Sequence, residues 1–145
     1  MNSISNRKLN IKKHADGIAE SRDKWINKNS YYYNNDISYM KFLVGENKRI
    51  LDLGCGTGKL LSALNPSYGV GVDISSNMIS IAQKNYPKHE FIIGDIEDKE
   101  LIDNNELEIN DDYFLKLTSL YLLLTRVKKK SSDSFVKKFS ILPKP

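Results

Sequence analysis

The chain has 145 residues, of which 40% are hydrophobic and 28% charged, and it contains one cysteine and two histidines. This length suits one domain, a single cysteine excludes an internal disulfide, and two histidines exclude a histidine-rich metal site. The net charge of +4 arises at the C-terminus, where residues 126–145 hold seven Lys or Arg and one acid. A uniformly basic surface for nucleic acid is therefore excluded, and a contact through the tail alone stays a minor alternative.

Residues 1–17 are polar and without periodicity, which predicts a flexible N-terminal segment. They also lack the apolar stretch of a signal peptide, so we expect a cytoplasmic protein. A short helix is predicted over residues 18–29, anchored by Trp25. The most apolar segment, residues 113–127, is interrupted by Lys116 and is shorter than the roughly 20 residues of a membrane span.

Strand and helix patterns alternate through the middle of the chain. Tyr33, Ile37, Met40 and Val44 form one helical stripe that ends at Gly45. Further helices are predicted at residues 59–64 and 76–86, and strands at residues 49–53, 68–73 and 90–94. This order predicts an α/β fold with a mainly parallel sheet, flanking helices and right-handed crossovers.

The pattern weakens after Asp95. Residues 95–112 hold nine acids and one lysine, which predicts an exposed connection or a weak helix. Residues 113–117 are a candidate fourth strand and residues 119–127 a candidate helix. We therefore divide the chain into a flexible segment (1–17), a ligand-binding domain (18–127) and a basic tail (128–145).

A glycine-rich turn follows the first predicted strand, at Gly54, Gly56 and Gly58. Such a turn presents backbone amides to a ligand and lets it approach closely. A dinucleotide fingerprint needs glycine at position 59, where Lys59 stands, and a P-loop needs a hydroxyl at position 60, where Leu60 stands. With Asp52 two residues before the turn, the ligand is expected to carry a cationic or neutral group there.

Two further acids end the next strands. Asp73 is placed to accept hydrogen bonds from both hydroxyls of a ribose, and Asp95 to accept one from an exocyclic adenine amine. The alternatives that involve no ligand are a helix cap at Asp73, a solvated acid at Asp95 and a tight turn at the glycines. Because the strand ends meet at one crevice, we prefer a ligand site.

Three segments, residues 50–58, 70–75 and 91–95, resemble in order and spacing the first three motifs of class I, Rossmann-like methyltransferases that use S-adenosylmethionine. The resemblance spans residues 15–98. It implies that Asp52 and the turn lie along the methionine part of the cofactor, that Asp73 holds ribose, and that Asp95 and Ile96 frame adenine. Ile74 and Met78 are implied as apolar contacts of the adenine ring. The implied cofactor-binding residues are Asp52, Gly54, Cys55, Gly56, Gly58, Asp73, Ile74, Met78, Asp95 and Ile96.

Several side chains that could be reactive are interpreted as structural or surface residues. Cys55 follows a strand end but has no partnered histidine, so we interpret it as a small packing residue and not a nucleophile. His14 and His89 are expected at the surface. Tyr31 to Tyr33 are either packing tyrosines or a cover for the methionine end. We assign no catalytic residue and no metal site.

The family normally has seven strands, so the chain is expected to be truncated relative to that fold. The first functional hypothesis is an S-adenosylmethionine-dependent methyltransferase acting on a small molecule, since methyl transfer depends largely on positioning. The alternative is an inactive cofactor-binding remnant or a partner-dependent subunit. An exposed sheet edge also predicts a homo-oligomer.

Overall fold

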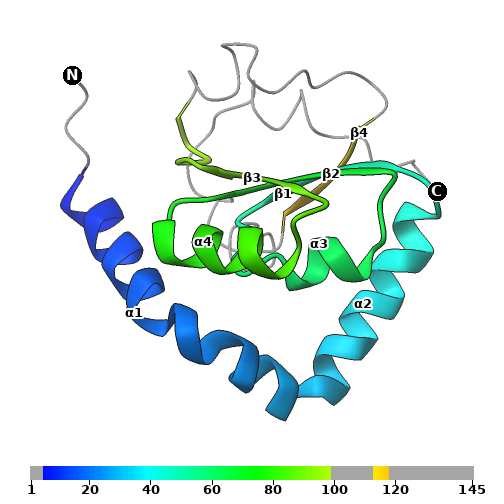
Figure 1. The fold of residues 1–145 in the computed structure, drawn as a ribbon, viewed down its shortest axis with the longest axis horizontal. Coiled ribbons are helices and arrows are strands. Elements are labelled where there is room, and N and C mark those ends of the chain that lie inside the picture. Colours follow the sequence, from blue (N-terminus) through cyan, green and yellow to red (C-terminus); the bar gives the residue numbers. More distant parts are fainter. Residues whose placement is uncertain (1–4, 99–112, 118–145) are drawn as a thin grey trace, which may run out of the picture.

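A computed structural model describes residues 5–98 and the strand at 113–117. The helices and strands are α1 (Asn6–Lys28), α2 (Ser30–Val44), β1 (Arg49–Leu53), α3 (Lys59–Ala63), β2 (Tyr68–Asp73), α4 (Ser76–Asn85), β3 (Glu90–Ile93) and β4 (Tyr113–Leu117). Figure 1 shows these elements in the colours of the sequence. The candidate helix at 119–127 and the basic tail lie outside the described residues.

The four strands form one parallel sheet in the order β3-β2-β1-β4. In its register, Leu51 of β1 faces Val70 of β2, and Val72 of β2 faces Ile92 of β3. Every strand therefore ends at the same edge of the sheet, and the loops after β1, β2 and β3 lie next to one another. The predicted α/β fold with a parallel sheet is confirmed, and the part of the chain that the structure describes holds four strands of it.

Side chains alternate between the two faces of the sheet, as strand geometry requires. One face carries Ile50 and Phe91, which pack with side chains of α2, α3 and α4. The other face carries a second apolar cluster. The buried members of that cluster are Leu51, Leu53, Val70 and Val72.

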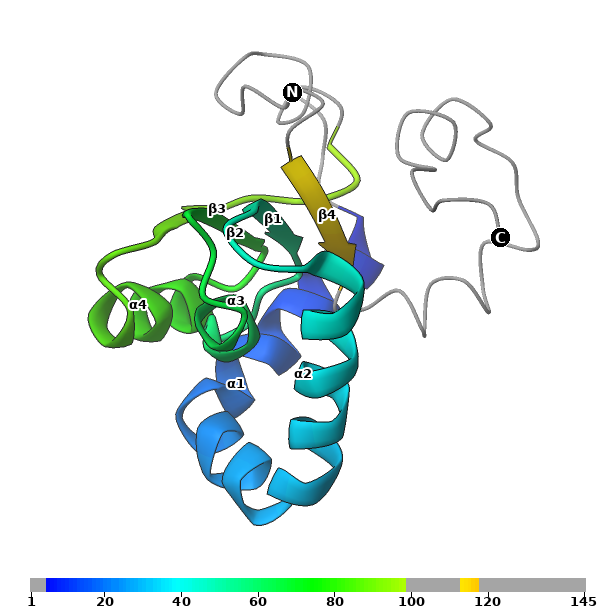
Figure 2. The ribbon, with the colours of Figure 1, turned by 90° about the vertical axis from the view of Figure 1, so that its right-hand side faces the viewer.

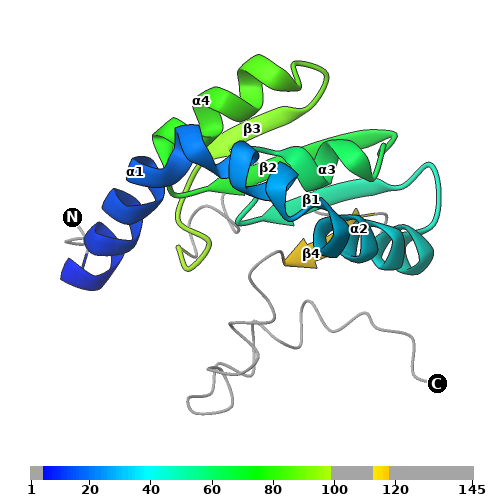
Figure 3. The same cartoon turned by 90° about the horizontal axis from the view of Figure 1, so that it is seen from below.

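The four described helices lie on one side of the sheet (Figure 1). Because the order steps the same way from β1 to β2 and from β2 to β3, two crossovers of one hand place α3 and α4 on the same face. The helices α1 and α2 join at Asn29 and form the two arms of a V beneath α3 and α4 (Figure 1), and α2 is the arm nearest the viewer in Figure 2. Seen from below, α1 runs beside α4 and meets α2 at its C-terminal end (Figure 3).

The first helix is longer than the sequence pattern predicts. It begins at Asn6, capped by the Ser5 hydroxyl, which accepts a hydrogen bond from the Lys8 amide. Only Ala19 and Ile26 of its 23 residues are buried. Trp25 does not anchor this helix as predicted, since its side chain is 62% exposed. An expectation of flexibility for residues 6–17 is therefore wrong, although the division into three parts stays a prediction.

The predicted elements between residues 30 and 94 agree closely with the structure. Ile37, Met40 and Val44 of α2 contact the core, and α2 ends at Gly45, whose φ is 75°. The expectation for His89 is wrong: its side chain is buried, with 8% exposed, and its Nδ1 occupies the space in which a Cβ at Gly69 would lie. The absent side chain of Gly69 thus makes room for the histidine.

No helix among the described residues is long and apolar enough to cross a membrane. Within the same part of the chain, no group of three or more His, Cys, Asp or Glu side chains could hold a metal ion.

Candidate functional site

The turn between β1 and α3 is built from left-handed glycines. Gly54, Gly56 and Gly58 have φ values of 80°, 55° and 74°, which side chains with a Cβ rarely adopt. The amides of Gly54 and Cys55 both donate to the Val72 carbonyl at the end of β2, over 2.7 and 3.0 Å. These bonds fix the turn against the neighbouring strand.

Asp73 ties the turn to the start of the following helix. Its Oδ2 accepts a hydrogen bond from the Gly56 amide at 2.8 Å, and its Oδ1 accepts one from the Ser75 amide at 2.9 Å. A carboxylate oxygen has two acceptor positions, so each oxygen keeps one after these bonds are made. The half-buried Asp73 therefore fits a pair of vicinal hydroxyls such as those of a ribose.

Asp52 and Cys55 lie on the inner side of the turn and are both buried. Burial raises the pKa of the Cys55 thiol far above its ordinary value, and the nearby carboxylates of Asp52 and Asp73 raise it further. A thiol in this environment stays protonated and is a poor nucleophile. This geometry supports the packing role predicted for Cys55.

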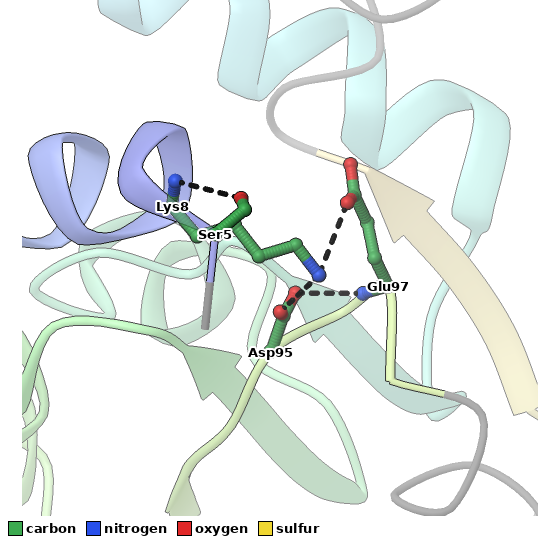
Figure 4. Close-up of polar contacts among 4 residues, drawn as sticks. All are labelled: Ser5, Lys8, Asp95 and Glu97. Carbon is green, nitrogen blue, oxygen red and sulfur yellow. Dashed lines mark hydrogen bonds and ion pairs between the residues drawn. The ribbon is translucent and has the colours of Figure 1, made fainter. Parts of the chain in front are cut away.

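Asp95 follows β3 and contacts α1 (Figure 4). Its Oδ1 accepts a hydrogen bond from the Glu97 amide at 2.9 Å, while its Oδ2 lies 2.5 Å from the Lys8 ammonium. The hydrogen bond to Asp95 raises the pKa of Lys8, although burial opposes the shift. The acid predicted to meet adenine is thus paired with a lysine from a distant part of the chain.

The predicted apolar contacts divide between two faces. Met78 is buried in the first turn of α4, and its amide donates to the Ser75 hydroxyl at 3.1 Å. Ile74 is half-buried in the loop before α4. Ile96 packs against the cluster on the far face of the sheet, which contains Leu51 and Val72. Asp73, Ile74 and Met78 thus belong to one loop and helix start, and Ile96 belongs to the next loop.

Helix α1 contributes residues to this edge that the sequence pattern did not indicate. The Asp16 carboxylate accepts a hydrogen bond from the Ser75 hydroxyl at 2.6 Å, and Asp23 accepts one from the Thr57 hydroxyl at 2.6 Å. The Nε of Arg22 lies 2.9 Å from the position of a Cβ at Gly56. With Lys8 on Asp95, α1 therefore contacts the loops after β1, β2 and β3.

The partly buried side chain of Tyr33 interacts with Arg22. Burial raises the pKa of the Tyr33 hydroxyl, and a hydrogen bond with the Arg22 side chain acts in the opposite direction. Tyr31 and Tyr32 are instead exposed. The predicted tyrosine cluster is thus split, with only Tyr33 directed toward the turn.

A sequence model of the methyltransferase domain matches residues 50–140. The match includes the glycine turn, Asp73 and Asp95, and it covers more than half of the chain. The chain belongs to this methyltransferase family. Its members use S-adenosylmethionine, and the class I assignment made from the three motifs is confirmed.

Similar proteins support the same family. The malonyl-[acyl-carrier protein] O-methyltransferase of Bacillus cereus is 34% identical over 122 residues, which are 79% of this chain and 45% of that enzyme. The carboxy-S-adenosyl-L-methionine synthase 1 of Yersinia pseudotuberculosis is 28% identical over 104 residues, covering 69% of this chain and 42% of that protein. The chain thus spans less than half the length of these curated relatives.

Among solved structures, a methyltransferase in complex with the Haloferax volcanii Trm112 methyltransferase activator is similar, with a TM-score of 0.50 and 25% identity. The similarity covers 70% of this chain and 46% of the Haloferax chain. The magnesium protoporphyrin IX methyltransferase of Synechocystis, with bound S-adenosylmethionine, shares the fold, with a TM-score of 0.51 at 19% identity over 66% of this chain and 57% of the other. The fold of this methyltransferase-family chain is therefore Rossmann-like.

Proposed function

We propose that this chain binds S-adenosylmethionine at the ends of β1, β2 and β3 and donates its methyl group to a small-molecule acceptor. One observation carries the proposal: the Gly56 amide donates to Asp73, 17 residues away, and so joins the glycine turn to the predicted ribose acid. The turn expected to bind the methionine part and the acid expected to bind the ribose are therefore adjacent, as a ligand that joins an amino acid to a nucleoside requires.

Each residue has a role in this proposal. Asp52 and the turn of Gly54, Cys55, Gly56 and Gly58 bind the methionine part, Asp73 binds the ribose, and Asp95 with Ile96 binds the adenine edge. Ile74 and Met78 contact the adenine ring. The buried carboxyl group of Asp52 is placed to accept hydrogen bonds from the cationic groups at the methionine end.

The chemistry demands little from protein side chains. Bound S-adenosylmethionine supplies a methyl group on a sulfonium, and transfer is an in-line displacement that depends on the alignment of donor and acceptor. In this proposal the glycine turn and Asp73 hold the methyl donor in a fixed position. The protonated Cys55 thiol does not compete with the acceptor as a nucleophile.

Calorimetric titration with S-adenosylmethionine and S-adenosylhomocysteine tests the proposal, with ATP and NAD as unrelated nucleotides. We expect saturable binding of the first two only. Asp73→Ala should weaken binding at least tenfold, because a charged hydrogen-bond partner is worth about 1.5–3 kcal/mol. Glu46→Gln, in the exposed loop after α2, is the matched control and should bind normally. Absence of binding by the parent chain would refute the proposal.

A second proposal draws on the similar Haloferax methyltransferase, whose solved structure is a complex with a methyltransferase activator. In this alternative the chain is a donor-binding subunit that transfers methyl groups only with a partner, or an inactive remnant. Binding of the cofactor without transfer to any of a panel of acceptors would favour it. Transfer by the purified chain would favour the first proposal.

A further inference from the structure

Helix α2 is apolar on two opposite faces. At about 100° per residue, Tyr33, Ile37, Met40 and Val44 point to one side, where the last three contact the core. On the opposite side of α2, a second set of apolar residues lies within an arc of about 120° around the helix axis. These residues, here called the aromatic face, are Tyr31, Tyr32, Tyr39, Phe42 and Leu43.

The aromatic face is open to solvent. The exposed fractions are 73% for Tyr31, 72% for Tyr32, 62% for Tyr39, 83% for Phe42 and 40% for Leu43. Figure 2 shows α2 nearest the viewer, with no described helix or strand in front of it. A contiguous exposed apolar patch of this kind marks an interaction site.

The chemistry of this face is that of a protein interface. The other residue within the arc, Asn35, is neutral, while Ser38 and Asp36 lie about 20° beyond its two edges. Interface centres are enriched in tyrosine and phenylalanine and depleted of lysine and acids. Because the face itself contains no charged side chain, two copies can pack there without burying a charge at the centre, and Asp36 stays at the border.

The area of the face is close to what a dimer requires. With about 200 Å² for each aromatic side chain, the exposed parts of the four rings offer about 600 Å² per copy. A standard interface buries about 800 Å² per partner, and Leu43 with the flanking polar residues adds to the total.

The residues are arranged so that the face can pair with itself. Tyr31 and Tyr32 lie in the first turn of α2, Phe42 and Leu43 lie in the last turn, and Tyr39 lies between these pairs. When two copies pack antiparallel about a two-fold axis, the tyrosine pair of one meets Phe42 and Leu43 of the other. This arrangement also aligns the two helix dipoles in opposite directions, which is favourable.

We propose that two copies of this chain associate through the aromatic faces of antiparallel α2 helices. This dimer is independent of cofactor binding, because none of the five residues belongs to the glycine turn or to the loops after β2 and β3. It also differs from a dimer built on a sheet edge, in which the exposed edge of a strand such as β3 would pair.

Sedimentation velocity of the purified chain, from about 1 µM to about 200 µM, tests the proposal. The mass should rise from 16.6 kDa toward twice that value as concentration increases. Phe42→Lys should raise the dissociation constant of the dimer at least tenfold, because a charge replaces a central aromatic contact. Asn34→Lys adds the same charge to an exposed position of α2 outside the arc, and should leave the dimer intact.

Far-UV circular dichroism ensures that both variants are folded, which the 83% exposure of Phe42 leads us to expect. A second measurement uses the double variant Tyr31→Cys and Phe42→Cys. Since the native Cys55 is buried, oxidation should link the copies through the new thiols only. A parent chain that stays monomeric at every concentration overturns the proposal, and so does a dimer that Phe42→Lys leaves unchanged, as expected for a sheet-edge dimer.

Discussion

Substitution of Gly58 by alanine should destabilise the domain through two separate effects. The φ of Gly58 is 74°, a left-handed conformation that costs a residue with a Cβ about 1–2 kcal/mol. The new Cβ would also lie 2.7 Å from two ring carbons of Phe91 and 3.2 Å from the Cβ of Ala82. Phe91 is buried, so its ring cannot simply turn toward solvent.

The overlap with Phe91 should add about 1–3 kcal/mol, the usual cost of overpacking. Gly58→Ala should therefore lower the free energy of unfolding by about 2–5 kcal/mol in total. This is a large part of the roughly 5–15 kcal/mol that stabilises a domain. Urea denaturation followed by circular dichroism measures the change.

Gly45 provides the matched control, because its φ is 75° but the nearest atom to its Cβ position is the Lys48 Cε at 4.0 Å. Gly45→Ala should therefore cost only about 1–2 kcal/mol. In a Phe91→Leu background the ring is absent, and Gly58→Ala should then approach the cost of Gly45→Ala. Equal losses for the two single glycine variants would refute the contribution of Phe91.

Two further predictions concern charge. Lys8→Gln frees the Asp95 oxygen from its ion pair. Because a surface ion pair is worth about 0–1 kcal/mol, S-adenosylmethionine binding should tighten about two- to fivefold at low salt. Calorimetry at low and high salt measures the affinity, with Lys13→Gln as the control, and weaker binding by Lys8→Gln would contradict the prediction. Burial lowers the pKa of His89, so below its ordinary pKa the unfolded state binds more protons than the folded state. The contribution of His89 to the free energy of unfolding should be constant above about pH 6.5 and should fall below it, by at most about 1.4 kcal/mol per pH unit, until the lowered pKa is reached. Urea denaturation across pH should show this slope vanish in His89→Leu and persist in His14→Gln.

The central βαβ units could be predicted because their residues carry local signals. The strand over residues 49–53 is a short apolar run before glycines, and the strand over residues 68–73 ends in an acid before a serine cap. The alternation of side chains then determines which residues face α3 and α4. The positions of Asp52, Asp73 and the glycine turn follow from these local features.

The length of α1 could not be predicted, because the helix is docked mainly by polar side chains. Lys8, Asp16 and Asp23 contact Asp95, Ser75 and Thr57, whereas only Ala19 and Ile26 are buried. A helix held in this way has no apolar stripe to reveal it. Its partners lie far along the chain, so local periodicity contains no trace of them.

The burial of His89 could not be predicted for a similar reason. Its burial depends on the absence of a side chain at Gly69, 20 residues earlier, and on the Phe91 ring beside it. A glycine inside a predicted strand was the one available signal, since such a glycine often marks close approach by another group.

The contacts of α1 also have a consequence for the order of folding. Its hydrogen bonds to Ser75 and Thr57 close loops of 59 and 34 residues. The connection between β1 and β2, which contains the short helix α3, is much shorter. Contacts that close long loops form late, after the entropy of closure has been offset by earlier packing. Helix α1, although it precedes the sheet in the sequence, should therefore be the last described element to pack onto the domain and the first to detach from it.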